Sequence, residues 1–282
     1  MSSKTIKVYL AGVRNLHITH GDGDPFVGCE RLRLQLRGIK RSKGRYRRYM
    51  FPFSPANLKK ARSTCFHKLR VSQPQRVLWA TVTLAYFGLL RCSEYAPTTP
   101  SKFDPQRQLT VSDVTFYPDR VNPNYMTVFI SQSKTDPFRH GQLVTVGATS
   151  NELCPVRAMK NMIEGDTART REPTSPLFTQ AGGKPLSRST VVATIKRMAK
   201  ACGLPVSSYS SHSLRRGGAS ALWAAGFSRE QVMLMGRWLS NAYILYVAEP
   251  HDRLAGAAAR MASVNLDPTD KMHTSDWGSS EM

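Results

Sequence analysis

The sequence predicts a mainly helical protein that contains one small three-stranded antiparallel sheet. Apolar residues recur at helical spacing over most of the 282 residues, as they do in helices that bury one face. The spacing changes to alternation in three short runs between residues 109 and 146, which is typical of strands with one buried face. The longest largely apolar run, at 77–90, is too short to cross a bilayer and therefore predicts a buried helix.

The first half of the chain supplies helices and then the sheet. GDGDP (21–25) marks a turn between two helices, and RYMFPFSP (48–55) has the composition of a linker into a second domain. An amphipathic stretch and the apolar run come next, before the three alternating runs. The elements expected here are helices at 4–20, 28–40, 54–70 and 75–91, and strands at 109–117, 124–133 and 142–146.

Helices resume in the second half of the chain. Ser228 and Gln231 stand three residues apart, which fits a capping box at the start of one of these helices. The tail from residue 265 is polar, and this composition predicts disorder. The expected helices are 154–164, 188–201, 213–225, 228–237 and 241–248, followed by a short final helix at 251–263.

The balance of charge predicts a polyanionic partner, most often a nucleic acid. The chain has 40 Lys and Arg residues against 19 Asp and Glu, a formal net charge of +21. Membrane-surface binding needs a basic amphipathic helix or a lipidation signal, and we find neither. The stretch 31–48 has no interleaved acid, so we interpret it as a phosphate-contacting surface. Its candidate DNA contacts are Arg37, Lys40, Arg41, Lys43, Arg45, Arg47 and Arg48.

The sequence gives no support for a metal site or a disulfide framework. The five cysteines are dispersed and include no Cys-x-x-Cys pair. We interpret them as reduced thiols of an intracellular protein. HITH (17–20) precedes GDGD but lacks further ligands and does not fit an EF-hand loop.

Several residues of the second domain have side chains suited to phosphoryl transfer. Two guanidiniums clamp one phosphate and neutralise the charge that develops on it. A tyrosine attacks phosphorus and holds it as an ester, while a lysine protonates the departing alkoxide and a histidine exchanges a proton with the phenol. The candidate catalytic residues are Arg91, Lys134, His212, Arg215, Trp238 and Tyr246. Glu94 is expected to orient Arg91, and Arg216 and Arg237 are expected to contact DNA.

In order and in spacing, this set resembles the tyrosine recombinase (phage integrase) family. GLLRCSE, SKTDPFRHG, LCPVRAM and GRW-x-S-x-A-x-x-x-Y also resemble the branch carried by eukaryotic mobile elements. The resemblance spans roughly 4–250. It implies a partial SAM-like core-binding region at 1–48 and the catalytic-domain fold of the family at 49–264, with a tail at 265–282.

The resemblance also implies a role for each catalytic candidate. Arg91 and Arg215 hold the scissile phosphate of double-stranded DNA, and Trp238 occupies the His-or-Trp position of the family. Lys134 is the general acid for the 5′ oxygen, and His212 assists proton transfer. Tyr246 forms a 3′-phosphotyrosine, with no cofactor, metal or ATP. The implied assembly is a homotetramer on two DNA sites, working in the nucleus of a eukaryote or otherwise in the cytoplasm or nucleoid.

The sequence leaves three alternatives open. Tyr243 lies three residues before Tyr246 on the same helical face, and only the spacing from Trp238 favours Tyr246. The same chemistry without partner exchange would make the protein a type IB topoisomerase. Because 1–48 contains only part of a core-binding domain, the chain is also compatible with a DNA-binding protein that does not cut.

Overall fold

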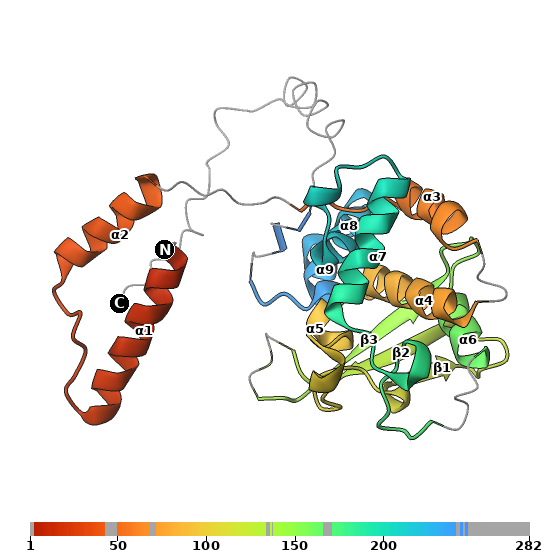
Figure 1. Ribbon diagram of the computed structural model, residues 1–282, viewed down its shortest axis with the longest axis horizontal. Helices are drawn as coiled ribbons and strands as arrows, with labels where there is room; N and C mark the ends of the chain where they lie inside the picture. The colour runs from red at the N-terminus through yellow and green to blue at the C-terminus, as the bar shows by residue number, and fades with distance from the viewer. Residues whose placement is uncertain are drawn as a thin grey trace, which may run out of the picture. The chain divides into compact units, whose positions relative to one another are not determined.

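The structure, a computed structural model, describes residues 3–42, 50–67, 72–133, 136, 138–165, 171–240, 243, 244, 246 and 247. It divides into two units, one ending at Tyr49 and the other beginning at Met50. The predicted class is confirmed: the second unit is mainly helical and contains a three-stranded antiparallel sheet (Figure 1). Within the described residues, no helix combines the length and apolar character of a membrane span.

The first unit is a pair of helices, α1 (Ser3–His20) and α2 (Glu30–Ser42). The predicted turn at 21–25 joins them, and Gly21 and Gly23 take the positive φ values of 83° and 75° that suit glycine. The carboxylate of Asp24 pairs with Arg14 Nε at 2.7 Å across this turn. None of the side chains described between residues 5 and 42 is buried, so this pair has no core of its own.

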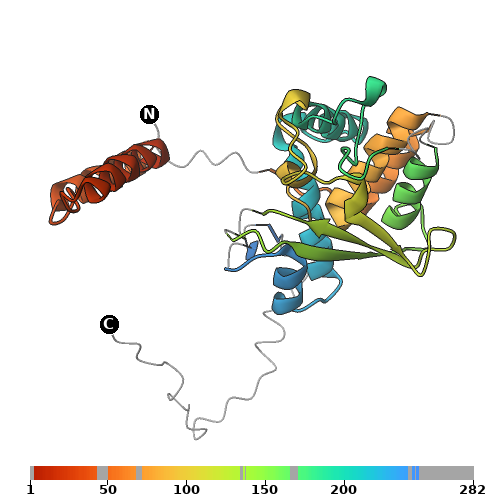
Figure 2. The same ribbon diagram turned by 90° about the horizontal axis from the view of Figure 1, so that it is seen from below.

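In the second unit, helices cover one face of the sheet (Figure 2). Strands β1 (Val114–Tyr117), β2 (Tyr125–Ile130) and β3 (Gln142–Gly147) pair in sequence order. Their buried side chains alternate and face the helical side of the sheet, where β3 contacts α6 (Figure 2). The helices of this unit are α3 (Pro55–Cys65), α4 (Gln73–Phe87), α5 (Cys92–Tyr95), α6 (Pro155–Glu164), α7 (Arg188–Ala201), α8 (Ser211–Ala224) and α9 (Arg229–Gly236).

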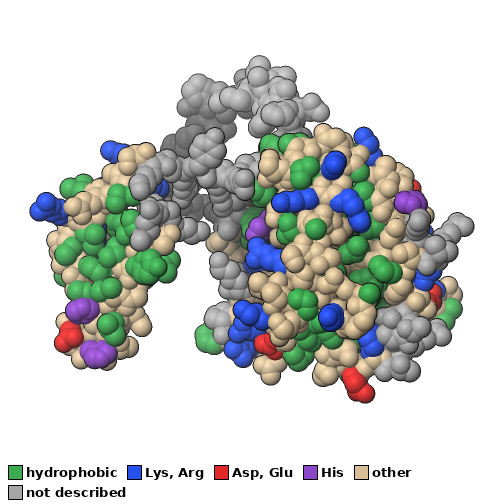
Figure 3. All heavy atoms as spheres, in the orientation of Figure 1, with side chains coloured by type: hydrophobic (Ala, Val, Ile, Leu, Met, Phe, Trp, Pro, Cys, Tyr) green, Lys and Arg blue, Asp and Glu red, His purple; other side chains and the backbone are tan. Residues whose placement is uncertain are grey.

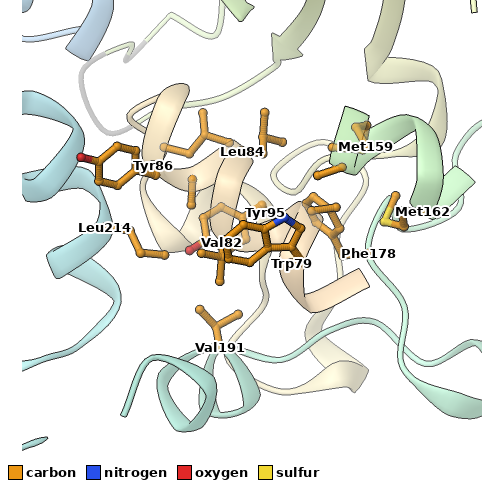
Figure 4. Packing of buried hydrophobic residues seen from close by; sticks show 14 of the residues in the cluster. Trp79, Val82, Leu84, Tyr86, Tyr95, Met159, Met162, Phe178, Val191 and Leu214 are labelled. Carbon is orange, nitrogen blue, oxygen red and sulfur yellow. The ribbon is translucent and has the colours of Figure 1, made fainter. Parts of the chain in front are cut away.

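Helix α4 is the centre of the core. It carries the apolar run that predicted a buried helix, and nine of its residues are buried. Trp79 and Tyr86 lie on it among side chains from α5, α6 and α8, including Tyr95, Met159 and Leu214 (Figure 4). Both α6 and α8 pack against this helix.

Several elements differ in their bounds from the sequence prediction, and four of the differences exceed three residues or change the type of element. The apolar helix ends at Phe87 rather than 91, with Gly88 as its C-cap. The first alternating run becomes a strand only from Val114, because the Asp113 carboxylate accepts hydrogen bonds from the Thr110 backbone and hydroxyl and holds a short turn. The helix expected at 54–70 ends at Cys65. Near 241–248 the described residues form a turn, with Tyr246 N donating to Tyr243 O at 2.7 Å.

The predicted capping box of α9 is confirmed, since Ser228 Oγ accepts from Gln231 N at 3.2 Å. The predicted final helix at 251–263 and the tail from 265 lie outside the described residues.

Candidate active site

Five predicted site residues converge from separate elements of the second unit. Arg91 is the N-cap of α5, and His212 and Arg215 lie in the first two turns of α8. Trp238 follows α9 directly, and Tyr246 lies in the turn beyond it. The helix end at Phe87 matters here, because it makes Arg91 the first residue of a new turn instead of the last residue of a buried helix.

The carboxylate of Glu94 organises the residues around Arg91. Glu94 Oε2 accepts from the Arg91 backbone N–H at 2.7 Å, and Oε1 accepts from Arg91 Nη1 at 3.1 Å. Its side chain is only 2% exposed, whereas that of Arg91 is 16% exposed. A buried carboxylate thus holds a guanidinium that still reaches the surface, as we predicted for Glu94.

Arg215 is the most buried arginine of the site. Only 1% of its surface is exposed, and its guanidinium donates to the backbone carbonyls of Leu89 and Gly236. The same guanidinium lies over the Trp238 ring at 4.5 Å from the ring centroid. Burial, reinforced by the nearby Arg91, lowers the pKa of Arg215 to about 9. Arg215 is therefore held in place by carbonyls and an aromatic face, and no carboxylate from the described part of the chain pairs with it.

Tyr246 packs between the aromatic and the cationic residues. Its ring lies 5.1 Å from that of Trp238 and 6.4 Å from that of His212. The guanidinium carbons of Arg215 and Arg216 lie 5.7 and 6.0 Å from its ring centroid. Gly236 allows this arrangement, because a Cβ at that position would lie 1.6 Å from the Trp238 ring.

Tyr243 has different neighbours. It is 6% exposed and packs with Leu89, Ala219 and Val232, and Arg229 lies over its ring at 5.8 Å. Tyr243 is buried in this cluster, and Tyr246, which is partly buried, packs against it. The two tyrosines differ in that Tyr246 also lies beside the guanidiniums of Arg215 and Arg216 on α8.

His212 is exposed at the edge of the site. Partial burial, together with the guanidiniums of Arg188, Arg215, Arg216 and Arg91, lowers the pKa of His212 below its usual value. A neutral imidazole beside a phenol is suited to accept its proton.

Arg188 was not predicted from the sequence, although among the nearby charges it has the largest effect on the pKa of His212. It is exposed in the first turn of α7, after the N-cap Ser187. The one sequence signal was its place at a helix start in LSRST, which by itself is common.

Arg237 differs from the prediction of a DNA contact. Its side chain is 4% exposed and forms an ion pair with Glu94, Nη2 to Oε2 at 2.8 Å. It also donates to the carbonyls of Gly88 and Leu89. In this structure the Arg237 guanidinium is therefore directed at a carboxylate and backbone carbonyls inside the protein rather than toward a DNA surface, from a backbone with φ 56°.

The remaining predicted contacts fall into two groups. Arg37, Lys40 and Arg41 are exposed on α2, in the first unit, whereas Arg216 is buried beside Tyr246, with 9% of its surface exposed. Lys134, Lys43, Arg45, Arg47 and Arg48 lie outside the described residues. Basic side chains outnumber acidic ones on the face seen in Figure 3.

The site has an excess of positive charge. Among the ion pairs of the described residues, Arg91 and Arg237 share one buried carboxylate, Glu94, and Arg215 takes part in none. Such a set stabilises an anion with two or more oxygens, for example a phosphodiester. Groups of His, Cys, Asp and Glu able to hold a metal ion do not occur in the described ranges.

Comparisons with known proteins connect this geometry to a family. Residues 75–247, more than half of the chain, match the family described as "Phage integrase family". The matched range includes every candidate active-site residue named above. No curated protein matches the sequence.

Three solved structures illustrate the likeness of fold. XerH recombinase bound to palindromic difH substrate is 16% identical, with a TM-score of 0.54, over 75% of this chain and 53% of that one. XerA recombinase is 12% identical, with a TM-score of 0.51, over 94% and 84%. The Tn1549 transposon integrase in complex with transposon right end DNA is 16% identical, with a TM-score of 0.54, over 93% and 81%. The chain therefore spans about half the length of the XerH chain and most of the other two.

Proposed function

Since the chain belongs to the phage integrase family, a family of tyrosine-type DNA recombinases, we propose that it cleaves and rejoins double-stranded DNA through a 3′-phosphotyrosine intermediate. The observation that carries this proposal is the packing of Tyr246 against Trp238, His212 and the guanidinium of Arg215. A phenol in that position lies beside the groups that hold a phosphate and accept a proton.

The chemistry divides into two proton transfers and one displacement. The Tyr246 oxygen attacks phosphorus and loses its proton toward His212, while the bond from phosphorus to the 5′ oxygen breaks. Arg91 and Arg215 stabilise the charge on the non-bridging oxygens. The family pattern assigns protonation of the departing 5′ oxygen to Lys134. Because the ester keeps the energy of the broken bond, a 5′ hydroxyl reverses the reaction without ATP.

The wider biological assignment is also a proposal. Four sequence motifs alone, GLLRCSE, SKTDPFRHG, LCPVRAM and GRW-x-S-x-A-x-x-x-Y, favour a recombinase carried by eukaryotic mobile elements. Such an enzyme would serve the integration or recombination of mobile DNA. Assembly as a homotetramer on two DNA sites and action in the nucleus follow from the same resemblance. Contacts to DNA from the α2 residues Arg37, Lys40 and Arg41 follow from their exposure and charge.

The first test is covalent attachment to DNA. Purified protein is incubated with nicked or supercoiled DNA, quenched in detergent and examined for a protein–DNA adduct. We expect an adduct with the wild type and with Tyr243→Phe, which keeps its ring in the apolar cluster, and none with Tyr246→Phe. DNA binding should be nearly unchanged in both variants, because each loses a single hydroxyl.

Other outcomes would redirect the assignment. An adduct lost in Tyr243→Phe but kept in Tyr246→Phe would transfer the nucleophile to the buried tyrosine. Tight, salt-dependent DNA binding without any adduct would indicate a binding protein on the same fold. Relaxation of supercoils with no joining of two duplexes would favour the topoisomerase alternative.

A further inference from the structure

Arg237 has an unusual backbone for a residue with a long side chain. It caps the C-terminus of α9 with φ 56° and ψ 47°, in the left-handed region. A residue with a Cβ is uncommon there, and glycine is the usual occupant at this end of a helix. The backbone N–H groups of Arg237 and Trp238 donate to Leu234 O and Met233 O, so the helix end is well formed. An arginine in this position indicates a function for its side chain.

The side chain of Arg237 divides the Glu94 carboxylate with Arg91. Arg237 Nη2 contacts Oε2 at 2.8 Å, while Arg91 Nη1 contacts Oε1 at 3.1 Å. Side-chain exposure is 4% for Arg237 and 16% for Arg91. Of these two guanidiniums, the buried one therefore holds the carboxylate from the inside, and the other is more exposed and near enough to Arg215 to lower the pKa of Arg215.

A second set of contacts fixes Arg237 to the segment that leads into Arg91. Its Nη1 donates to Gly88 O at 3.3 Å, and its Nη2 lies 3.4 Å from Leu89 O. Leu89 O also accepts from Arg215. One buried guanidinium thus ties the end of α4 to the end of α9, between the two arginines that face the reacting phosphate in the proposed function.

Without Arg237, Glu94 would be free to pair with the Arg91 guanidinium through both carboxylate oxygens. With only Arg91 beside it, a buried carboxylate gains most from a two-oxygen contact with that guanidinium. Such a pair would turn more of the Arg91 nitrogens toward Glu94 and fewer toward a substrate. Arg237 and the Arg91 backbone N–H, at 2.8 and 2.7 Å, together occupy Oε2 and leave Oε1 to the Arg91 guanidinium.

We propose that Arg237 is a positioning residue: by holding Oε2 of Glu94, it keeps the Arg91 guanidinium directed at the scissile phosphate. This inference rests on the proposed function, and it concerns the binding of a phosphate group, which is measurable without cleavage. It replaces the DNA contact expected from the sequence with a role inside the protein.

The test compares variants of Arg237 by phosphate binding. The probe is inorganic phosphate, and the measurement is the rise in melting temperature over chloride at equal ionic strength. Arg91→Gln defines the part of this rise that belongs to the site. Arg237→Gly relieves the backbone and removes the charge, and Arg237→Gln removes the charge alone should the glycine variant fail to fold. Both should bind phosphate about tenfold more weakly, the effect of losing one charge-assisted hydrogen bond.

The double variant Arg237→Gly/Glu94→Gln separates positioning from a merely structural role. A neutral amide no longer competes for Arg91, so phosphate binding should recover most of the loss. If Arg237 only supports the fold, the additional removal of the Glu94 carboxylate should weaken phosphate binding further. The control is Arg107→Gln, which breaks an exposed pair with Asp104 at 3.3 Å and should leave the phosphate effect unchanged.

The results distinguish this inference from the proposed function. The positioning role would be overturned if Arg237→Gly or Arg237→Gln bound phosphate as tightly as the wild type does. It would also be overturned if the double variant did not recover phosphate binding. Both results hold whether or not the protein cuts DNA. Weakened binding that recovers in the double variant supports it. If the wild type then forms no adduct with DNA, the proposed reaction fails while the positioning of Arg91 stands.

Discussion

At the scale of single residues, partial burial first and the surrounding arginines second determine the protonation state of His212. Four guanidiniums, from Arg91, Arg188, Arg215 and Arg216, disfavour a proton on the imidazole. Of these, Arg188 is exposed in the first turn of α7. The pKa of His212 is lowered in consequence, so the ring is neutral at pH 7 and able to receive the phenolic proton of Tyr246.

His212 should titrate below its usual value of 6.5 in the DNA-free protein, and proton NMR of the imidazole measures the midpoint. Arg188→Gln removes a positive charge that opposes protonation, so the midpoint should move up toward 6.5. Arg107→Gln, which lies at an unrelated exposed pair, should not move it. A His212 midpoint above 6.5 in the wild type would contradict this account of the site. So would a midpoint that is the same in Arg188→Gln as in the wild type.

At the scale of elements, two glycines set the distance between α8 and its neighbours. A Cβ on Gly217 would lie 2.2 Å from Phe53 O, and one on Gly218 would lie 2.1 Å from Tyr86 O. These are backbone atoms, which cannot rotate away as a flexible side chain does. The pair directly follows Arg215 and Arg216, so the close approach of α8 to α4 also carries the site arginines into place.

Alanine at Gly217 or Gly218 should therefore push α8 away from α4. We expect a loss of about 1–3 kcal/mol in the free energy of unfolding, as for other overpacked cores, together with slower adduct formation because Arg215 moves with the helix. Denaturant unfolding measures the first effect. Gly147→Ala is the matched control, since a Cβ there meets nothing within 4 Å. Equal stability of Gly217→Ala and Gly147→Ala would contradict the close-packing argument.

At the scale of the whole molecule, charge and core are distributed differently between the units. The second unit has the buried core and the candidate site. The first unit has no buried side chain among residues 5–42, but it carries exposed Arg37, Lys40 and Arg41 on α2. With a net charge of +21 over the chain, long-range attraction to DNA is expected to be strong and salt-dependent.

The triple variant Arg37→Gln/Lys40→Gln/Arg41→Gln tests the contribution of α2. If all three contact phosphates, the slope of log affinity against log salt concentration should fall by about 2.7, at about 0.9 for each contact. Fluorescence anisotropy with one DNA duplex at several salt concentrations measures the slope. An unchanged slope would show that α2 does not face DNA. These residues belong to the first unit, whereas the candidate active site lies in the second. The triple variant should therefore still form the adduct when DNA is saturating.

The sequence by itself determined the fold class, the order of most elements and the types of side chain available for chemistry. These follow from local periodicity, from capping residues such as Ser228 and Gln231, and from the spacing of motifs along the chain. The end of α4 was harder to predict, because the apolar run continues through Leu89 and Leu90 although the helix stops at Phe87. Leu89 and Leu90 are buried although they lie beyond the helix, so their apolar character indicates burial and does not show where the helix ends.

Only the tertiary structure decided which side chains meet. It separated Tyr246 from Tyr243, turned Arg237 inward to Glu94 and brought Arg188 near His212. Each of these depends on contacts between segments distant in the sequence, such as the 143 residues between Glu94 and Arg237. An arginine has the same local pattern whether it faces water or a buried carboxylate, because the free energy that separates the two comes from the partner and from the loss of solvent.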